Sequence, residues 1–158
     1  FLFQSNALYD SMTVRENLEF PLRRHWLSAE QKNVDKLVGE VLKSVGLAHT
    51  KHMMPAELSG GMRKRIALAR TLILKPEIIL YDEPTTGLDA ITGMEIIELI
   101  KQVQHQYQTS ALVISHNMKL ALHAATRIAV LLDGKCGATG TYQELSTSQD
   151  PNIRAFFD

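Results

Sequence analysis

The spacing of the apolar residues changes near residue 76 of this 158-residue chain. Before that point, apolar positions recur every three or four residues, which predicts helices. After it, short continuous apolar runs such as "IILYDE" and "SALVIS" alternate with longer helical patterns. Apolar strands that alternate with helices predict an α/β fold, with a parallel sheet covered by helices on both faces. We therefore expect a helical part at about residues 5–75 and an α/β part at about 76–158.

Two helices are predicted in the first 46 residues. Thr13 and Glu16 form a capping box that begins the first helix, and Pro21 is expected to end it. Ser28 and Gln31 repeat the capping pair. The helix that follows has apolar residues at helical spacing and a glycine expected at its C-cap; these residues are Val34, Leu37, Val38, Val41, Leu42, Val45 and Gly46.

The second half of the chain has a regular alternation of elements. A strand is expected at 78–83 and another at 110–115, with helices at 90–106 and 118–125. A hairpin at 127–140 turns at Asp133-Gly134. A short helix capped by Thr141 and an apolar tail with Ile153, Phe156 and Phe157 complete the pattern.

Composition excludes several classes of protein. Seventeen basic residues balance seventeen acidic ones, so no overall field favours nucleic acid or an anionic membrane surface. The single cysteine, Cys136, excludes an intrachain disulfide framework and fits a reducing compartment. No apolar run approaches the roughly 18 residues of a membrane span. The chain opens "FLFQ" without Met, as if inside a strand, so we expect it to be a fragment.

Two adjacent carboxylates, Asp82 and Glu83, end the strand "IILYDE". The carboxyl edge of a parallel sheet is where open α/β folds bind ligands. Since side chains alternate along a strand, we expect the two carboxylates to point to opposite faces. Asp82 would then support Mg²⁺, and Glu83 would orient or deprotonate a water. The alternative is a solvated strand end before Pro84.

Two polar residues are expected at the same edge. His116 follows the strand at 110–115, and a histidine there can contact a phosphate. Gln4 follows the apolar "FLF" and can offer an amide oxygen to a metal ion or water. Each residue alone has a simpler explanation as an ordinary surface side chain.

The stretch "LSGGM" predicts an anion site. Ser59 can cap a helix that begins at Gly60 or Gly61, and the glycines let the backbone approach a ligand. Free N–H groups and the positive end of the helix dipole attract an anion. Further positive charge follows at Arg63, Lys64 and Arg65. The alternative is a glycine-rich helix start with a solvated basic face.

Together, "LSGGMRKRIALARTL", "IILYDEP", "TTGLD" and "VISH" closely resemble, in order and spacing, motifs of the ATP-binding cassette (ABC) ATPases. They match the signature motif, Walker B motif, D-loop and switch histidine, and Gln4 stands as the Q-loop. The resemblance covers essentially the whole chain. It implies a P-loop NTPase-like parallel sheet with an all-helical subdomain, and ATP and Mg²⁺ as cofactors.

The resemblance also implies a role for each matching residue. Asp82 and Gln4 would support Mg²⁺, Glu83 would be the general base, and His116 would contact the γ-phosphate. The signature residues, which are Ser59, Gly60 and Gly61, would hold the γ-phosphate of the ATP bound by a second copy of the protein. Asp89 would bridge the two copies.

One part of the family's site has no counterpart here. The sequence contains no G-x-x-x-x-G-K-[ST] loop, and its only Gly-Lys pair, at Gly134, belongs to the expected hairpin. In the family this loop precedes the Q-loop, so we expect it upstream of Phe1. We therefore interpret the chain as a partial nucleotide-binding domain, and the chain alone is expected to be inactive.

The stretch "FQSNALYDSMTVRENLEFPLRRH" resembles the ATPases of bacterial MCE-type lipid-asymmetry or toluene-tolerance transporters, as do "GLDAITG" and "DPNIRAFFD". Asn6 and Ala90 depart from that group, which tends to have Gly and Pro there. This resemblance implies phospholipid transport at the cytoplasmic face of the bacterial inner membrane, by a homodimer with a transmembrane permease subunit, an MCE-domain protein and no nucleic acid. Leu18, Phe20, Leu22 or Trp26 would contact the permease, or else form the protein's own core.

Two other functions stay open. One is a soluble ABC-family ATPase that acts in translation, repair or cofactor assembly, which the neutral charge and the lack of long heptad patterns disfavour. The other is a degenerate regulatory ABC protein without ATPase activity, which the missing phosphate-binding loop suggests.

Overall fold

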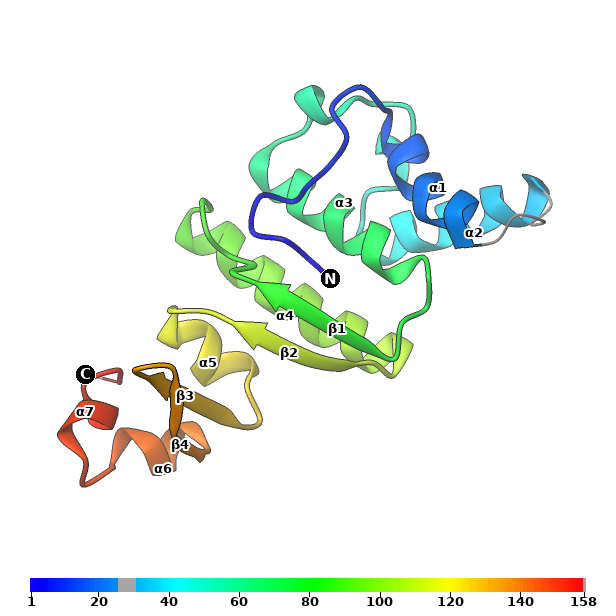
Figure 1. The fold of residues 1–158 in the computed structure, drawn as a ribbon. Helices are drawn as coiled ribbons and strands as arrows, with labels where there is room; N and C mark the ends of the chain where they lie inside the picture. The colour runs from blue at the N-terminus through cyan, green and yellow to red at the C-terminus, as the bar shows by residue number, and fades with distance from the viewer. Residues whose placement is uncertain (26–30, 158) are drawn as a thin grey trace. The chain divides into compact units, whose positions relative to one another are not determined.

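The computed structural model describes residues 1–25 and 31–157, in two compact units. The first unit is Phe1–Ile114 and the second is Ser115–Asp158. Figure 1 gives the order of elements along the chain.

Two helices open the first unit, and the first runs further than expected. Helix α1, Val14–His25, begins at the predicted capping box, in which Thr13 N donates to Glu16 Oε2 at 2.7 Å. Pro21 lies inside this helix, so the prediction that it ends the helix is wrong. The apolar face formed by Val14, Leu18 and Leu22 is buried on both sides of the proline. Burial of this continuous face offsets the hydrogen bond that Pro21 cannot donate.

Helix α2, Gln31–Ser44, confirms the predicted apolar face and its end. Five of the six apolar positions are buried and Leu37 is partly buried. Gly46 has a φ of 73°, and Leu47 N donates to Leu42 O at 2.8 Å, the pattern of a glycine C-cap. The proposed cap Ser28 lies outside the described residues.

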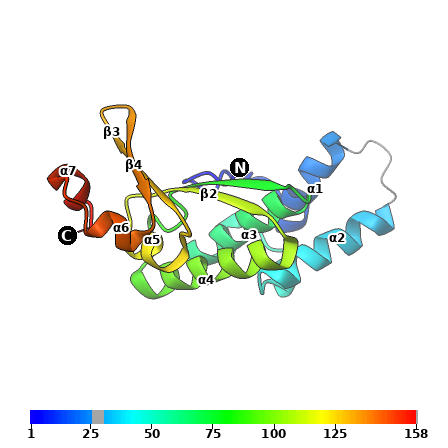
Figure 2. The ribbon, with the colours of Figure 1, turned by 90° about the horizontal axis from the view of Figure 1, so that it is seen from below.

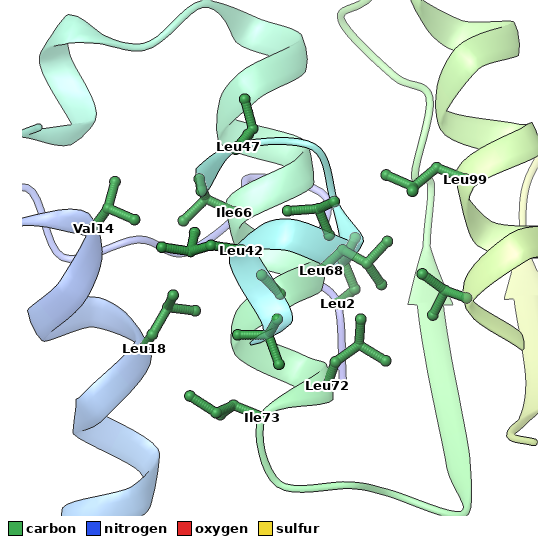
Figure 3. Close-up of a cluster of buried hydrophobic side chains, with 14 of the residues drawn as sticks. Leu2, Val14, Leu18, Leu42, Leu47, Ile66, Leu68, Leu72, Ile73 and Leu99 are labelled. Atoms are coloured by element: carbon green, nitrogen blue, oxygen red, sulfur yellow. The ribbon is translucent and has the colours of Figure 1, made fainter. Parts of the chain in front are cut away.

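Helix α3, Gly60–Leu72, is the central element of the helical region. Two short 3₁₀ turns precede it, Ala48–Thr50 and Pro55–Glu57. Figure 3 shows side chains from α1 and α3 meeting Leu2, Leu42 and Leu99 in one buried cluster. Residues 1–114 therefore share one core, and the boundary expected near residue 75 stays a prediction.

The strands of the first unit form a parallel pair. Strand β1, Ile78–Asp82, pairs with β2, Ser110–Ile114, so that Asp82 lies opposite Ile114. Leu2 forms a parallel bridge to Tyr81 on the other side of β1. Helix α4, Ala90–Tyr107, makes the crossover between the strands, which confirms the predicted order.

Helices cover one face of this strand pair. In Figure 2, α3 and α4 lie on the same side of β1 and β2. On the other face, Ile78, Leu112 and Ile114 are 62%, 59% and 60% exposed. Cover on both faces is thus not found within residues 1–114, because the helices before and after β1 both pack on one face.

The second unit contains a hairpin and short helices. It comprises α5, Met118–Ala124; β3, Ile128–Leu132; β4, Lys135–Gly140; α6, Tyr142–Ser146; and α7, Pro151–Arg154. The predicted turn is confirmed, with positive φ values of 48° at Asp133 and 75° at Gly134. Val130, Leu145 and Ile153 form a small core. Across the described part of the chain, no helix has the length and apolarity needed to cross a membrane.

Candidate active site

Strand pairing brings Gln4 and Asp82 to the same edge of the sheet. Leu2 N donates to Leu80 O at 2.8 Å, and Asp82 N donates to Leu2 O at 2.9 Å. Gln4, two residues further on, therefore follows its strand segment at the carboxyl edge where β1 ends. Among the described residues, no three His, Cys, Asp or Glu side chains could enclose a metal ion. Mg²⁺ bound with a nucleotide needs only one or two protein oxygens, and Gln4 and Asp82 fit that requirement.

Glu83 leaves the strand in a left-handed conformation. Strand β1 ends at Asp82, and Glu83 has a φ of 46°. The expectation that strand alternation sets the directions of both carboxylates is therefore wrong, because Glu83 is no longer part of the pleat. Its N–H donates to Ile114 O at 2.9 Å, and its Oε2 accepts from Thr86 Oγ1 at 3.2 Å. Positive φ is uncommon in a non-glycine residue, and these hydrogen bonds help to hold Glu83 in it.

The start of α3 has the expected cap. Ser59 is the N-cap residue, and its Oγ accepts from Met62 N at 3.2 Å. The two glycines differ in what surrounds them. A Cβ on Gly61 would lie 2.6 Å from Thr92 Cγ2, whereas a Cβ on Gly60 would make an ordinary 3.5 Å contact with Leu88. Packing against α4 thus requires Gly61, while packing leaves Gly60 free for close approach of a ligand.

The basic run after the glycines is bound within the protein, and is not a solvated face. Arg63 Nη1 donates to Leu58 O at 2.6 Å, and Arg65 Nη2 pairs with Glu95 at 2.8 Å. Lys64 is only 3% exposed, and its Nζ donates to Gln4 O at 2.6 Å. Burial lowers the pKa of the Lys64 ammonium, and the charges of Asp82 and Glu83 oppose that shift. Sequence reasoning gave Lys64 only the role of added charge.

Arg70, further along α3, was also missed. Its Nη1 donates to Ala7 O at 2.7 Å and its Nη2 to Asn6 O at 3.0 Å. Its guanidinium lies 5.8 Å from the centre of the Tyr9 ring. Asn6 and Ala7 have φ values of 67° and 49°, so Arg70 secures a left-handed turn directly after Gln4. The only signal in the sequence was the position of Arg70 six residues beyond Lys64 on the same helix.

Asp89 has a structural role that the structure shows. It is the N-cap of α4, and its Oδ1 accepts from the N–H groups of Ile91 and Thr92 at 3.0 Å. Thr92 Oγ1 donates to its Oδ2 at 2.6 Å, and the bonds from Thr92 lower the pKa of Asp89. That Asp89 also bridges two copies of the protein stays a prediction.

His116 lies in the second unit, two residues after the end of β2. Its side chain is exposed. That it joins Asp82 and Glu83 in one site stays a prediction.

The residues expected to contact a permease divide into two groups. Leu18 and Leu22 lie in the core, so for these two the structural explanation is correct. Phe20 is partly buried and packs on Tyr9, with ring centres 4.7 Å apart. It lines a hollow of about 80 Å³ together with Met12, Glu16 and Arg23. Trp26 lies outside the described residues.

Residues 1–86 match the protein family described as "ABC transporter". The match covers more than half of the chain, and the chain belongs to this family. Solved structures agree with the fold. The dimeric ATP-binding cassette MJ0796, in a post-hydrolysis state bound to ADP and Pi, superposes with a TM-score of 0.77 at 34% identity, over 89% of this chain and 61% of that one.

Several curated proteins are also similar in sequence to this chain. The chain is 38% identical over 99% of its length to "Intermembrane phospholipid transport system ATP-binding protein MlaF" of Escherichia coli (strain K12), covering 58% of that protein. It is equally similar to "Protein TRIGALACTOSYLDIACYLGLYCEROL 3, chloroplastic" of Arabidopsis thaliana and to "Probable ribonucleotide transport ATP-binding protein mkl" of Mycobacterium leprae (strain TN), covering 49% and 45% of those proteins. The chain thus spans about half the length of these relatives.

Proposed function

We propose that the complete product of the gene encoding this chain hydrolyses ATP to drive a membrane transporter. The observation that carries the proposal is the edge at which Gln4, Asp82 and the left-handed Glu83 come together. Family membership supports the class of reaction. The missing G-x-x-x-x-G-K-[ST] loop limits the proposal to the complete gene product.

Each residue of the edge has a distinct task in this proposal. Asp82 and the Gln4 amide would hold Mg²⁺, which when bound would supply positive charge to the phosphates. Glu83 accepts a proton from the attacking water, or orients that water for attack. The fixed backbone of Glu83 keeps its carboxylate near one position, which favours a general base. From the sequence resemblance alone, we also propose that His116 would donate to the γ-phosphate.

The start of α3 completes the site in a second copy of the protein. Its N–H groups, capped by Ser59 and left uncrowded at Gly60, would hold the γ-phosphate of ATP bound to the opposite copy. Asp89 would bridge the two copies next to this contact. The dimeric state of MJ0796 supports a homodimer.

Phospholipid is the cargo that we propose. Support comes from the name of the relative from Escherichia coli, and the relative from Mycobacterium leprae, named for ribonucleotide transport, is equally similar. The proposed partners are a transmembrane permease subunit at the hollow beside Phe20 and an MCE-domain protein. The proposed location is the cytoplasmic face of the inner membrane.

Steady-state ATPase activity of the complete gene product tests the reaction. Glu83→Gln keeps the size and polarity of the side chain but removes the base, so kcat should fall at least about 100-fold. Glu77→Gln, in an exposed residue just before β1, is the matched control and should leave kcat unchanged. Equal activity of Glu83→Gln and the native protein would refute the proposed role of Glu83.

Co-purification of the complete protein from its native membranes tests the cargo. Recovery with a permease, an MCE-domain protein and bound phospholipid supports the lipid proposal. Recovery with a permease that binds ribonucleotides, or with no membrane protein, contradicts it.

A further inference from the structure

Lys64 joins two segments that are far apart in the sequence. It lies on α3, and its Nζ donates to the carbonyl oxygen of Gln4 at 2.6 Å. The same nitrogen makes a longer contact of 3.5 Å with the carbonyl oxygen of Glu83. One buried ammonium therefore contacts the backbone of Gln4, the proposed metal-binding amide, and of Glu83, the proposed general base.

These contacts add to backbone hydrogen bonds that hold the same segments, since Thr86 N also donates to the carbonyl oxygen of Glu83 at 3.2 Å. The N–H of Glu83 donates to Ile114 O at 2.9 Å, so its peptide groups are held from β2 on one side and from α3 on the other. Gln4 follows the Leu2 bridge and precedes the left-handed pair Asn6 and Ala7. Residues with positive φ persist only where their surroundings over-determine them.

Stability alone does not account for a lysine at this position. Burying an ammonium has a large desolvation penalty, and replacing a buried charge by an apolar residue of similar size is often neutral or stabilising. Lysine at this place is thus better explained by what it positions than by what it adds to folding.

We propose that Lys64 is a positioning residue that holds the Gln4 and Glu83 segments in one arrangement, so that the metal-binding amide and the general base act together. The inference rests on the proposed ATPase function and extends it to a residue that has no direct task in the proposed reaction. It gives the start of α3 a second task, within its own copy, besides holding the γ-phosphate of the opposite copy.

The test uses the complete gene product with Lys64→Met, which keeps the length and apolar stem, and Lys64→Gln, which keeps one hydrogen-bond donor. Lys101→Met is the matched control, because Lys101 is an exposed residue of α4 whose Nζ pairs with Glu98 at 3.0 Å. For each protein, kcat, the Kd for MgATP and the thermal midpoint are measured. Hydrogen exchange is followed at residues 4–8, at 83–86 and, for comparison, in α2.

A misplaced catalytic group lowers kcat with little change in binding, so Lys64→Met should lose about 10- to 100-fold in kcat. Its Kd for MgATP should change less than about threefold, and its thermal midpoint should stay within about 4 °C of the native value. Exchange should rise at residues 4–8 and 83–86 and not in α2. Lys64→Gln should lie between Lys64→Met and the native protein, and Lys101→Met should match the native protein.

Unchanged kcat together with unchanged exchange in Lys64→Met would overturn the inference. So would loss of folding in both Lys64 variants, because Lys64 would then serve stability alone. If the native protein hydrolyses no ATP, the proposed function fails, and the exchange measurement still decides whether Lys64 holds the two segments.

Discussion

The first turns of helices α3 and α4 pack closely at Gly61 and Thr92: a Cβ added to Gly61 would lie 2.6 Å from Thr92 Cγ2. Gly61 lies in the first turn of α3, which would hold a phosphate, and Thr92 lies in the first turn of α4, which Asp89 caps. The two parts of the proposed dimer contact are thus fixed to each other within one copy. Packing thus requires Gly61, and we propose that Gly60 is the glycine that the ligand approaches.

Gly61→Ala should destabilise the complete protein by about 1–3 kcal/mol, because the added methyl group overpacks the contact with Thr92. Thr92→Ser in the same chain removes Cγ2 but keeps the hydroxyl that donates to Asp89. The double variant should therefore recover most of the lost stability. Urea unfolding of the single and double variants measures this coupling.

Gly60→Ala is the control for that pair. Its Cβ makes only an ordinary contact, so the free energy of unfolding should change by less than about 1 kcal/mol. Its ATPase activity should nevertheless fall, since a methyl group would stand where the phosphate approaches. Equal destabilisation at both glycines would contradict the division of roles.

An ion-pair network holds α1 to the rest of the helical region. Glu19 is buried between Arg15 and Arg23, and Arg15 also pairs with Asp35 at 2.9 Å. Burial raises the pKa of Glu19, but the hydrogen bonds from the two arginines outweigh it and the net pKa lies below 4.5. The carboxylate therefore adds stability that is present above about pH 4.5 and is lost as the pH falls through the lower folded pKa.

Glu19→Gln should reduce the free energy of unfolding at pH 7 by about 1–2 kcal/mol, because it weakens the hydrogen bonds to Arg15 and Arg23, whose side chains are exposed enough to be solvated instead. The difference from the native protein should shrink as the pH falls from 4.5 toward 3. Glu98→Gln, which breaks an exposed pair with Lys101, should change stability by less than about 1 kcal/mol at pH 7. If the difference in the free energy of unfolding between Glu19→Gln and the native protein grew as the pH fell, the lowered pKa of Glu19 would be contradicted.

Asn6 and Ala90, the two positions at which this sequence departs from the pattern of the lipid transporters, both suit the local backbone. Asn6 has a φ of 67°, a conformation that Gly and Asn accept more readily than other residues. Ala90 is the first residue of α4, a position that favours Pro because its N–H has no partner within the helix.

Ala90→Pro should accordingly stabilise the protein by about 0.5–1 kcal/mol through a lower entropy of the unfolded chain. Thermal and urea unfolding would measure the gain. A loss of stability would show that the backbone at Ala90 does not suit a first helical position.

Local patterns in the sequence predicted the elements well. The α2 face ending at Gly46, the crossover helix and the Asp133-Gly134 turn all follow from spacing and turn chemistry. Pro21 was misinterpreted because packing of α1 outweighed a local rule. Which face of β1 and β2 the helices α3 and α4 cover could not be predicted, because an apolar strand does not reveal which face its helices take.

In the candidate site, residue types were predictable and long-range contacts were not. Ser59 as a cap and Asp82 at the strand end follow from their neighbours in sequence. The positive φ of Glu83 depends on β2, and the place of Lys64 depends on Gln4, sixty residues away. Charge alone could not distinguish a buried lysine from a solvated one.

The central claim is that one copy supplies Glu83 and the other supplies Gly60 to each site. Glu83→Gln and Gly60→Asp should each inactivate the complete protein, the second because its carboxylate repels phosphate. Mixing the two inactive proteins forms heterodimers in which one of two sites has both native residues. ATPase activity should return to about a quarter of the native value if copies exchange freely and sites act independently. A mixture that stays inactive, although its heterodimers form, would contradict a site shared between copies.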